Sequence, residues 1–413
     1  MKRRSRVRHQ GAPIGDRSLI GSPGRSRSKW VGTGEGRMNS RTSADSDRGT
    51  LEMRSTLPAR DYYAAEVFDL EKERIFYRNW FCVGREEQVP APGDFMVRDV
   101  VDENVLVVRD DAETLRAFYN VCRHRGTRLC EGEGSAGKAL SCPYHAWTYS
   151  LDGRLIATPN VPEMVGFDRT RLGLNAVALQ TWEGFIFVNL APEPGPLDRQ
   201  LGDWAGYARY HLGRLRTAHR FAYDVAANWK ILHENYNECL HCPRVHPELV
   251  KVIPVYRRGT MAEPDGIWGN RLVEGATSFT RTGRSRLPAL PDLTEEERGR
   301  YNGMTIFPNL ILDCFPDNVL YTILWPGAPE RTNVTCGLLV ESSTLGQPDF
   351  DPGDIVEFHD LVNRQDWGIC ERAQKGQRSR GYRQGVYPPQ DEYVHEFDQH
   401  YLRERGRGPE TPG

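Results

Sequence analysis

The run NWKILHENYNECLHCPRVHPE, residues Asn228–Glu248, gathers several metal-binding side chains into a short stretch. Glu238 and His241 are three residues apart, so on a helix they would share one face about one turn from each other. Pro243 continues a helix poorly and favours extended backbone just before it, so His246 is expected to turn back toward His241. Two histidines beside a carboxylate suit iron or zinc. The alternative is a set of ordinary polar residues near a helix end, and a feature upstream bears on the choice.

Two short cysteine–histidine pairs lie upstream, CRH (Cys122–His124) and CPYH (Cys142–His145). At this separation two adjacent loops can close around metal. Classical zinc fingers pair Cys with Cys and His with His, whereas each pair here mixes the two, so a structural zinc site is the weaker alternative. A Rieske [2Fe–2S] centre takes two Cys on one iron and two His on the other. We therefore expect the cluster ligands to be Cys122, His124, Cys142 and His145.

The stretches NVCRHRGTRLC (Asn120–Cys130) and SCPYHAWTY (Ser141–Tyr149) resemble the Rieske non-haem iron oxygenase α subunits. The similarity covers roughly residues 57–405. It implies an α+β protein, with a small all-β Rieske domain and a helix-grip (Bet v 1-like or START-like) catalytic domain built on an antiparallel sheet. It also implies two cofactors, a [2Fe–2S] cluster and a mononuclear non-haem Fe(II), and subunits that commonly form head-to-tail homotrimers.

A C-terminal helix predicted from Asp351 to Gly376 supplies a third iron ligand. Apolar residues recur every three or four positions along its expected buried face: Ile355, Phe358, Val362, Ile369 and Ala373. Asp366 falls in the gap of that stripe, where a carboxylate is costly unless it is paired or bound to metal. Asp366 is therefore the expected ligand, and a buried ion pair with an arginine is the alternative. The family's iron-ligand helix has a similar sequence.

The resemblance also assigns roles within the site. His241, His246 and Asp366 would form a 2-His-1-carboxylate facial triad, which leaves positions on Fe(II) for O₂ beside substrate. In the family, the acid before the first iron histidine hydrogen-bonds the second Rieske histidine of a neighbouring subunit. Here that contact would join Glu238 to His145 and carry electrons and protons between subunits. Glu238 departs from many ring-hydroxylating members, which have Asp at this position.

The pattern ENYNECLHCPRVHP (Glu234–Pro247) resembles the branch that acts on glycine betaine, choline, carnitine and stachydrine. It implies hydroxylation of an N-methyl carbon, which then leaves as formaldehyde. A quaternary ammonium group would need an aromatic cage. Candidate cage residues are Tyr236, Trp268, Phe279, Phe307 and Tyr321. The alternative is hydroxylation of an aromatic or alicyclic ring by the same machinery.

The source of electrons is expected outside this chain. GEGSAG (Gly132–Gly137) matches a dinucleotide fingerprint by letters, but it falls between the two ligand loops with no room for a βαβ unit. NAD(P)H and flavin are therefore expected only in a separate flavin- or ferredoxin-type reductase. The non-enzyme alternatives are a Rieske electron carrier or a zinc-stabilised binding module, and neither needs the second set of metal ligands.

The composition of the chain limits the possible classes of protein. The chain has 413 residues, 38% of them hydrophobic, enough for two domains with a sizeable core. Residues 1–50 carry 12 Lys and Arg against 4 Asp and Glu, which we interpret as a disordered basic extension rather than a nucleic-acid-binding segment. No apolar run approaches 18 residues, so no membrane span is expected. Nine cysteines, several beside histidine, favour metal ligation in a reducing cytoplasm over a disulfide scaffold.

Composition and periodicity give the following organisation: a disordered basic extension at 1–52, a helical lead-in at 53–79, the Rieske domain at 80–191, the mononuclear iron domain at 192–405 and a tail at 406–413. The predicted helices span 57–79, 201–212 and 351–376. The predicted strands are 95–97, 105–108, 117–119, 184–188, 221–225, 304–315, 319–325 and 333–342. Loops at 256–300 are expected to cover a substrate pocket.

Overall fold

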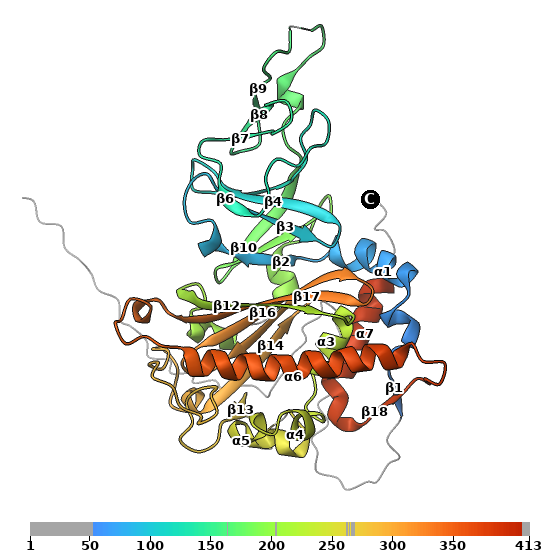
Figure 1. The fold of residues 1–413 in the computed structure, drawn as a ribbon, viewed down its shortest axis with the longest axis vertical. Coiled ribbons are helices and arrows are strands. Elements are labelled where there is room, and N and C mark those ends of the chain that lie inside the picture. Colours follow the sequence, from blue (N-terminus) through green and yellow to red (C-terminus); the bar gives the residue numbers. More distant parts are fainter. Residues whose placement is uncertain are drawn as a thin grey trace, which may run out of the picture.

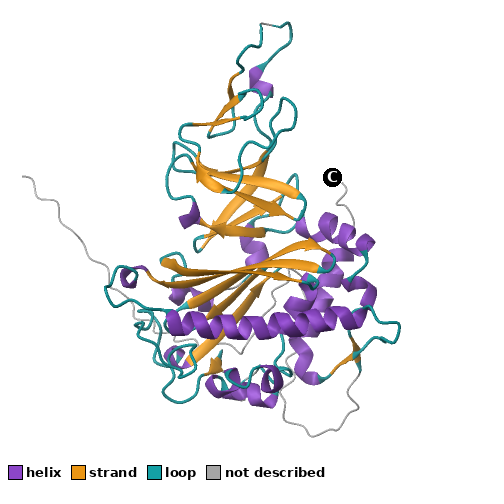
Figure 2. Cartoon of the chain, in the orientation of Figure 1, coloured by secondary structure: helices purple, strands orange, loops and turns teal. Residues whose placement is uncertain are grey.

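A small β-rich part stands on a larger part of mixed helix and sheet (Figures 1 and 2). The computed structural model describes residues 53–406 except 163, 203–204, 262, 264 and 266–268. The predicted basic extension and nearly all of the predicted tail lie outside the described residues, as does the cage candidate Trp268. Among the described helices, none has both the length and the hydropathy needed to cross a bilayer.

The small part contains two antiparallel sheets. Its strands are β2 (Phe81–Arg85), β3 (Asp94–Val100), β4 (Glu103–Arg109), β5 (Leu115–Tyr119), β6 (Glu133–Ser135), β7 (Ala139–Ser141), β8 (Thr148–Ser150), β9 (Leu155–Ala157), β10 (Ala176–Trp182) and β11 (Phe185–Asn189). The seven-stranded sheet has the order β2-β11-β10-β5-β4-β3-β6, and the three-stranded sheet the order β7-β8-β9. Strands β2 and β11 are buried throughout, because they lie against the larger part as well as within their own sheet.

The large part is built on a six-stranded antiparallel sheet with the order β12-β17-β16-β15-β14-β13. These strands are β12 (Leu215–Val225), β13 (Asn270–Arg271), β14 (Arg300–Ile306), β15 (Leu310–Cys314), β16 (Val319–Ala328) and β17 (Arg331–Glu341). The helices are α1 (Ala65–Glu71), α2 (Leu197–Leu201), α3 (Trp229–Tyr236), α4 (Cys242–Val245), α5 (Leu249–Val252), α6 (Gly353–Gln377) and α7 (Glu392–Gly406). The long α6 crosses one side of the sheet, and the small part lies on the other side (Figure 1). A long C-terminal helix held against an antiparallel sheet is the expected helix-grip arrangement.

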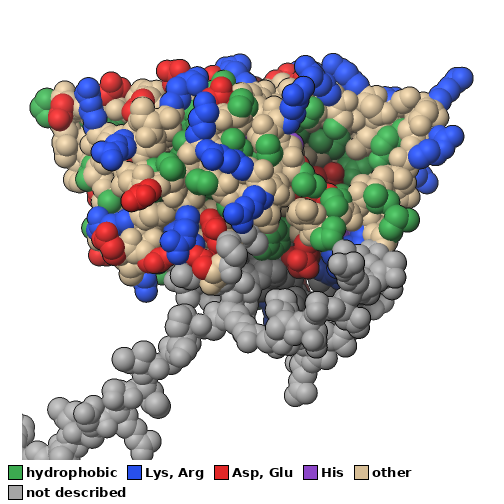
Figure 3. All heavy atoms as spheres, turned by 90° about the horizontal axis from the view of Figure 1, so that it is seen from below, with side chains coloured by type: hydrophobic (Ala, Val, Ile, Leu, Met, Phe, Trp, Pro, Cys, Tyr) green, Lys and Arg blue, Asp and Glu red, His purple; other side chains and the backbone are tan. Residues whose placement is uncertain are grey.

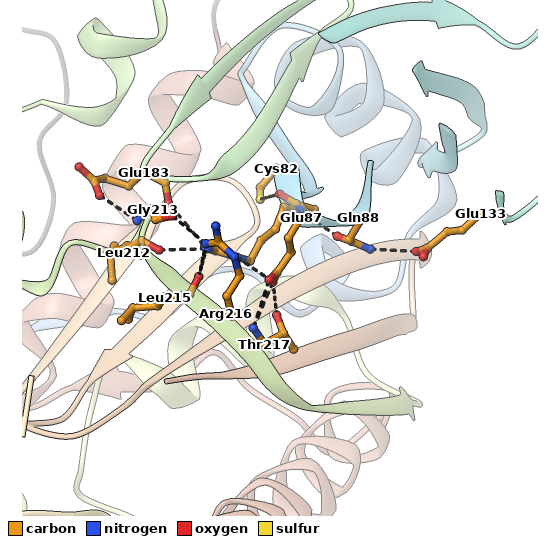
Figure 4. Close-up of polar contacts among 12 residues, drawn as sticks. Cys82, Glu87, Gln88, Glu133, Glu183, Leu212, Gly213, Leu215, Arg216 and Thr217 are labelled. Atoms are coloured by element: carbon orange, nitrogen blue, oxygen red, sulfur yellow. Dashed lines mark hydrogen bonds and ion pairs between the residues drawn. The ribbon is translucent and has the colours of Figure 1, made fainter. Parts of the chain in front are cut away.

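The two parts are joined by a buried arginine. Arg85 on β2 is 1% exposed, and its Nη2 atom donates to the carbonyls of Leu212 at 2.9 Å and Leu215 at 3.1 Å. Glu87 completes the contact, because it pairs with Arg85 and accepts from the backbone N–H of Thr217 at 3.3 Å (Figure 4). Charge-assisted hydrogen bonds of this kind fix the angle between the small domain and β12.

The lead-in packs on the large part and also contacts the small one, where the Lys72 Nζ atom pairs with Asp102 Oδ2 at 3.2 Å. A short strand, β1 (Arg54–Ser55), pairs with β18 (Val386–Tyr387) near the C-terminus. Glu71 at the end of α1 accepts from the Lys230 Nζ atom at 2.6 Å and from the Tyr401 hydroxyl at 2.7 Å, with both charged side chains fully buried. This pairing anchors the start of α3, from which the predicted iron-binding segment follows.

Three predicted elements have different bounds in the structure. The single helix at 57–79 is a short 3₁₀ helix at Ala59–Tyr62, then α1, then a π turn at Lys72–Phe76. In place of one helix at 201–212, α2 ends at Leu201, where Gly202 adopts a φ of 73°, and a 3₁₀ helix follows at Ala205–Tyr210. The strand at 304–315 is two strands, β14 and β15, separated by a turn at Phe307–Pro308 that doubles the chain back on itself.

Candidate functional site

The segment after α3 is a turn rather than a continued helix. α3 ends at Tyr236, so Glu238 and His241 do not share a helical face as the spacing suggested. α4 begins at Cys242, with Pro243 in its first turn, where the missing N–H costs no hydrogen bond. The extended backbone expected before Pro243 is therefore wrong. His241 precedes α4 and His246 follows it, which places both rings at the same short helix.

The structure brings His241, His246 and Asp366 together. One ligand atom from each lies within 4.8 Å of the others, a group that could hold a metal ion. Both Nε2 atoms face the same oxygen, Asp366 Oδ1, at 3.3 Å from His241 and 2.8 Å from His246. This donor set fits the 2-His-1-carboxylate arrangement typical of non-haem Fe(II).

The other nitrogen of each ring is held by a side chain outside this group. The His241 Nδ1 atom lies 2.5 Å from Glu238 Oε1, and the His246 Nδ1 atom lies 2.8 Å from Gln365 Oε1. A proton on Nδ1 donated to these oxygens leaves the lone pair of each Nε2 atom directed at the shared point beside Asp366. Such outer partners fix the tautomer and orientation of metal-binding histidines.

The pKa shifts of His241 and Asp366 agree with their pairing. Burial lowers the pKa of His241, but hydrogen bonds to Asp366 and Glu238 outweigh it and raise that pKa to about 10. Burial raises the pKa of Asp366, but hydrogen bonds from His241 and His246 hold it below its usual value. A metal ion bound here would displace protons from the rings, so its affinity would fall at acidic pH.

The face of α6 that carries Asp366 differs in part from the predicted stripe. Ile355, Phe358 and Val362 are buried as expected. Farther along the helix the buried positions are Cys370 and Gln374, whereas Ala373 is exposed and Ile369 half-buried. Asp366 nevertheless lies four residues from both Val362 and Cys370, on the face of α6 that these buried residues share. The helical periodicity therefore predicted its position on the inner face.

A disulfide joins Cys239 to Cys242, with their Cα atoms 4.9 Å apart. It closes the short loop that carries His241. The sequence favoured metal ligation over a disulfide scaffold, and this single local bridge lies beside the metal-binding group rather than linking distant parts of the chain.

The two Cys–His loops of the small domain have matching geometry. In each, the cysteine N–H donates to the carbonyl five residues later: Cys122 to Thr127 and Cys142 to Trp147, both at 2.8 Å. The His124 and His145 rings lie 4.7 Å apart between centroids, and both cysteines are buried. Paired loops that present two thiols inside and two imidazoles at the rim fit a Rieske cluster.

A tyrosine on β8, the strand after the second loop, contacts the first loop. The hydroxyl of Tyr149, on β8, lies 3.3 Å from Cys122 Sγ and accepts from the Arg123 N–H at 3.0 Å. His124 is exposed and His145 is half-buried, so the histidine edge of the proposed cluster faces outward.

The two candidate metal sites lie far apart within one chain. β7 and β8, which flank Cys142 and His145, lie toward one end of the longest axis of the molecule, and α4 lies at the other (Figure 1). The end that carries α4 and α5 shows acidic and basic side chains interspersed with hydrophobic ones rather than one charged patch (Figure 3). Within a single chain, the six-stranded sheet lies between the small part and α4 (Figure 1).

One cavity contains the triad and a wall of aromatic side chains. Of the cage candidates, Tyr236 and Phe279 line it. Phe307 and Tyr321 do not, because Phe307 packs 4.5 Å from the His400 ring and Tyr321 packs 5.6 Å from Phe185 in the small domain. Tyr321 alternates with Leu320 and Thr322, which do line the cavity, so its side chain projects from the opposite face of β16.

Several lining residues were not singled out from the sequence: Tyr256, Tyr301, Asp313, Phe315 and Trp367. Ile311, Asp313 and Phe315 come at every second position along and just after β15, as expected for one face of a strand. That alternation is the sequence signal from which these three lining residues could have been predicted. Met261 and Phe279 belong to the 256–300 loops, which therefore contribute to the cavity as predicted.

Comparison with known proteins agrees with this architecture. Residues 79–181 match the Rieske [2Fe-2S] domain, and residues 212–405 match the catalytic domain of the ring-hydroxylating α subunit. The chain belongs to the ring-hydroxylating α-subunit family of Rieske oxygenases. It is an oxidoreductase that uses a [2Fe–2S] cluster and a mononuclear iron, receives electrons from a separate donor and acts on a small molecule.

Among its relatives, the carnitine monooxygenase oxygenase subunit of Acinetobacter baumannii is 31% identical over 336 residues, covering 79% of this chain and 86% of that protein. The glycine betaine monooxygenase oxygenase subunit of Chromohalobacter salexigens is 34% identical over 367 residues, covering 80% and 81%. The crystal structure of the quaternary ammonium Rieske monooxygenase CntA with L-carnitine matches with a TM-score of 0.70 at 26% identity, covering 86% of this chain and 96% of that one.

Proposed function

We propose that this protein hydroxylates an N-methyl carbon of a quaternary or methylated amine, which then loses that carbon as formaldehyde. The hydroxylation consumes one O₂, two electrons from the reductase and two protons, and releases one water. The hydroxymethyl nitrogen then expels formaldehyde and a proton, so the amine leaves with one methyl group fewer. The iron supplies the oxygen-activating chemistry when bound, and the proposed ligands are His241, His246 and Asp366.

The observation that carries this proposal is the shared cavity. Both histidines and a set of aromatic rings line the same cavity. Tyr301 and Phe315 stack at 4.8 Å and Phe279 lies 4.6 Å from Phe315, so aromatic faces cluster along one wall. Aromatic faces attract quaternary ammonium groups. The relatives named above act on carnitine and glycine betaine, which supports the same chemistry here.

We infer a head-to-tail trimer in which the cluster of one subunit faces the iron of its neighbour. The separation of the two sites within one chain supports this arrangement (Figure 1). In it, Glu238 would hydrogen-bond the His145 ring of the next subunit, while its Oε1 atom holds the His241 ring of its own. The proposed cluster ligands are Cys122, His124, Cys142 and His145. A cytoplasmic location is proposed because reduced metal sites and a soluble reductase operate there.

The test is a turnover assay with a generic flavin-dependent reductase. Glycine betaine, choline, carnitine and N-methyl amino acids would be compared with aromatic acids for oxygen uptake and formaldehyde release. We expect formaldehyde, in proportion to O₂ consumed, from at least one methylated amine and from no aromatic acid. Ring hydroxylation of an aromatic acid without formaldehyde from any amine would replace this proposal with the ring-oxidation alternative.

A further inference from the structure

A carboxylate stands in the cavity among the aromatic rings. Asp313, on β15, lines the same cavity as the metal-binding group, and its side chain keeps part of its surface accessible while Leu312 and Cys314 on either side are buried. Its Oδ1 atom accepts hydrogen bonds from the Tyr236 hydroxyl at 2.7 Å and the Tyr301 hydroxyl at 2.6 Å. A charged carboxylate in such surroundings requires donors of this kind.

A glycine on the neighbouring strand leaves space for the two tyrosine hydroxyls beside Asp313. Gly303 on β14 is the direct partner of Asp313 across the strand pair. A Cβ atom at Gly303 would come within 2.4 Å of the Tyr301 hydroxyl and 2.7 Å of the Tyr236 hydroxyl. Any larger residue there would displace both donors. Burial, with the nearby charge of Asp313, raises the pKa of both tyrosines well above the usual value, so both remain protonated donors.

The described residues lining the cavity include no lysine or arginine. Their basic side chains are histidines, and two of these, His241 and His246, belong to the metal-binding group. His359 lines the cavity as well, but burial lowers its pKa to about 3, so it is neutral at physiological pH. The anionic group and the aromatic faces therefore both favour a cation at this wall of the cavity.

We propose that Asp313 determines specificity by contacting the cationic nitrogen of the substrate, and that the substrate is a net cation rather than a zwitterion. The matching chemical class is a choline-like quaternary amino alcohol or a protonated methylated amine without a carboxylate. This inference rests on the proposed function, because it names the substrate class of the same cavity. A zwitterion such as glycine betaine would have to place its own carboxylate in a cavity that already contains Asp313.

The test measures binding without turnover. Calorimetric titrations of the oxidised holoenzyme, with no reductase present, would compare choline, its neutral carbon isostere 3,3-dimethylbutan-1-ol, and glycine betaine. We expect wild-type protein to bind choline about 30-fold more tightly than the isostere, and more tightly than glycine betaine. Asp313→Asn should reduce the preference for choline over the isostere to about threefold, the part left to the aromatic faces. The matched control is Asp224→Asn on β12, where the carboxylate pairs with Arg331 at the surface.

Each outcome decides one claim. An Asp313→Asn protein that keeps the full preference for choline would overturn the role of Asp313. Equal or tighter binding of glycine betaine by wild-type protein would overturn the net-cation assignment, and that measurement needs no variant. If Asp313→Asn fails to incorporate the cluster, Asp313→Ser removes the same charge with a smaller side chain. Failure of the proposed function is a separate result, since wild-type protein would then release formaldehyde from no amine.

Discussion

The Oε1 atom of Glu238 lies 2.5 Å from the Nδ1 atom of His241 in the same chain. Glu238 can therefore orient the His241 ring in its own chain, a role separate from the contact to a neighbouring subunit that the proposed trimer gives it. Two substitutions at Glu238 distinguish these roles. Glutamine retains an oxygen that accepts a hydrogen bond from the His241 N–H, whereas alanine does not. Loss of an outer partner of a metal-binding histidine typically costs 10- to 100-fold in metal affinity.

For Glu238→Gln we expect full iron content and a rate of cluster-to-iron electron transfer at least about tenfold slower, because the proton-coupled link to His145 is weakened. For Glu238→Ala we expect iron affinity to fall about 10-fold or more as well. Metal analysis and single-turnover reoxidation of the reduced cluster, followed by absorbance, measure the two effects separately. An unchanged single-turnover rate in Glu238→Gln would remove the bridging role.

Asp366→Ala should abolish mononuclear iron binding and turnover while leaving the visible spectrum of the cluster intact. The reason is that both histidine Nε2 atoms face Asp366 Oδ1, so its loss removes the anionic member of the set. The matched control is Glu357→Ala on the same helix, since that side chain is 73% exposed. Iron content per chain is the measurement, and turnover retained by Asp366→Ala would exclude this residue from the site.

Tyr149→Phe should lower the reduction potential of the cluster. Hydrogen bonds to the ligand sulfurs stabilise the reduced cluster, and the Tyr149 hydroxyl lies 3.3 Å from Cys122 Sγ. Redox titration by EPR checks this, with Tyr119→Phe on β5 as the control in the same domain. If both variants keep the wild-type potential, the Tyr149 hydroxyl does not act on a cluster sulfur.

The sequence indicated the proposed metal-binding residues because their patterns are local. CRH, CPYH and the His241–His246 pair each span a few residues, and the periodicity of α6 located Asp366 without any tertiary information. The same periodicity failed at Ala373, because a helix of 25 residues drifts relative to any fixed repeat and its far end packs against different elements.

The cavity wall was predicted less well, because it depends on contacts between distant segments. Tyr236 and Asp313 are 77 residues apart and meet only through the packing of α3 on the sheet. Tyr321 was chosen for its aromatic ring, yet the face to which a strand residue points depends on register, which composition does not report. Asp313 itself was missed because a carboxylate among apolar strand residues resembles a turn signal until its tyrosine partners are known.

Asp398→Asn should stabilise the protein at pH 8 relative to wild type, with the difference shrinking toward zero at pH 5. Asp398 on α7 is 1% exposed and lies near the half-buried Glu234 on α3. Burial raises the pKa of Asp398 to about 7, against an ordinary value of 3.8. The folded state therefore binds more protons than the unfolded chain between about pH 4 and pH 7, and stability is lost as the pH rises through that window.

Asparagine keeps an acceptor for the Tyr387 hydroxyl, which lies 2.8 Å from Asp398 Oδ2. We expect a melting temperature about 3 °C or more above wild type at pH 8, measured by calorimetry at both pH values. The control is Glu357→Gln, a substitution at an exposed side chain, which should show no such pH-dependent difference. An Asp398→Asn protein less stable than wild type at pH 8 would show that the ionised Asp398 carboxylate stabilises the folded state.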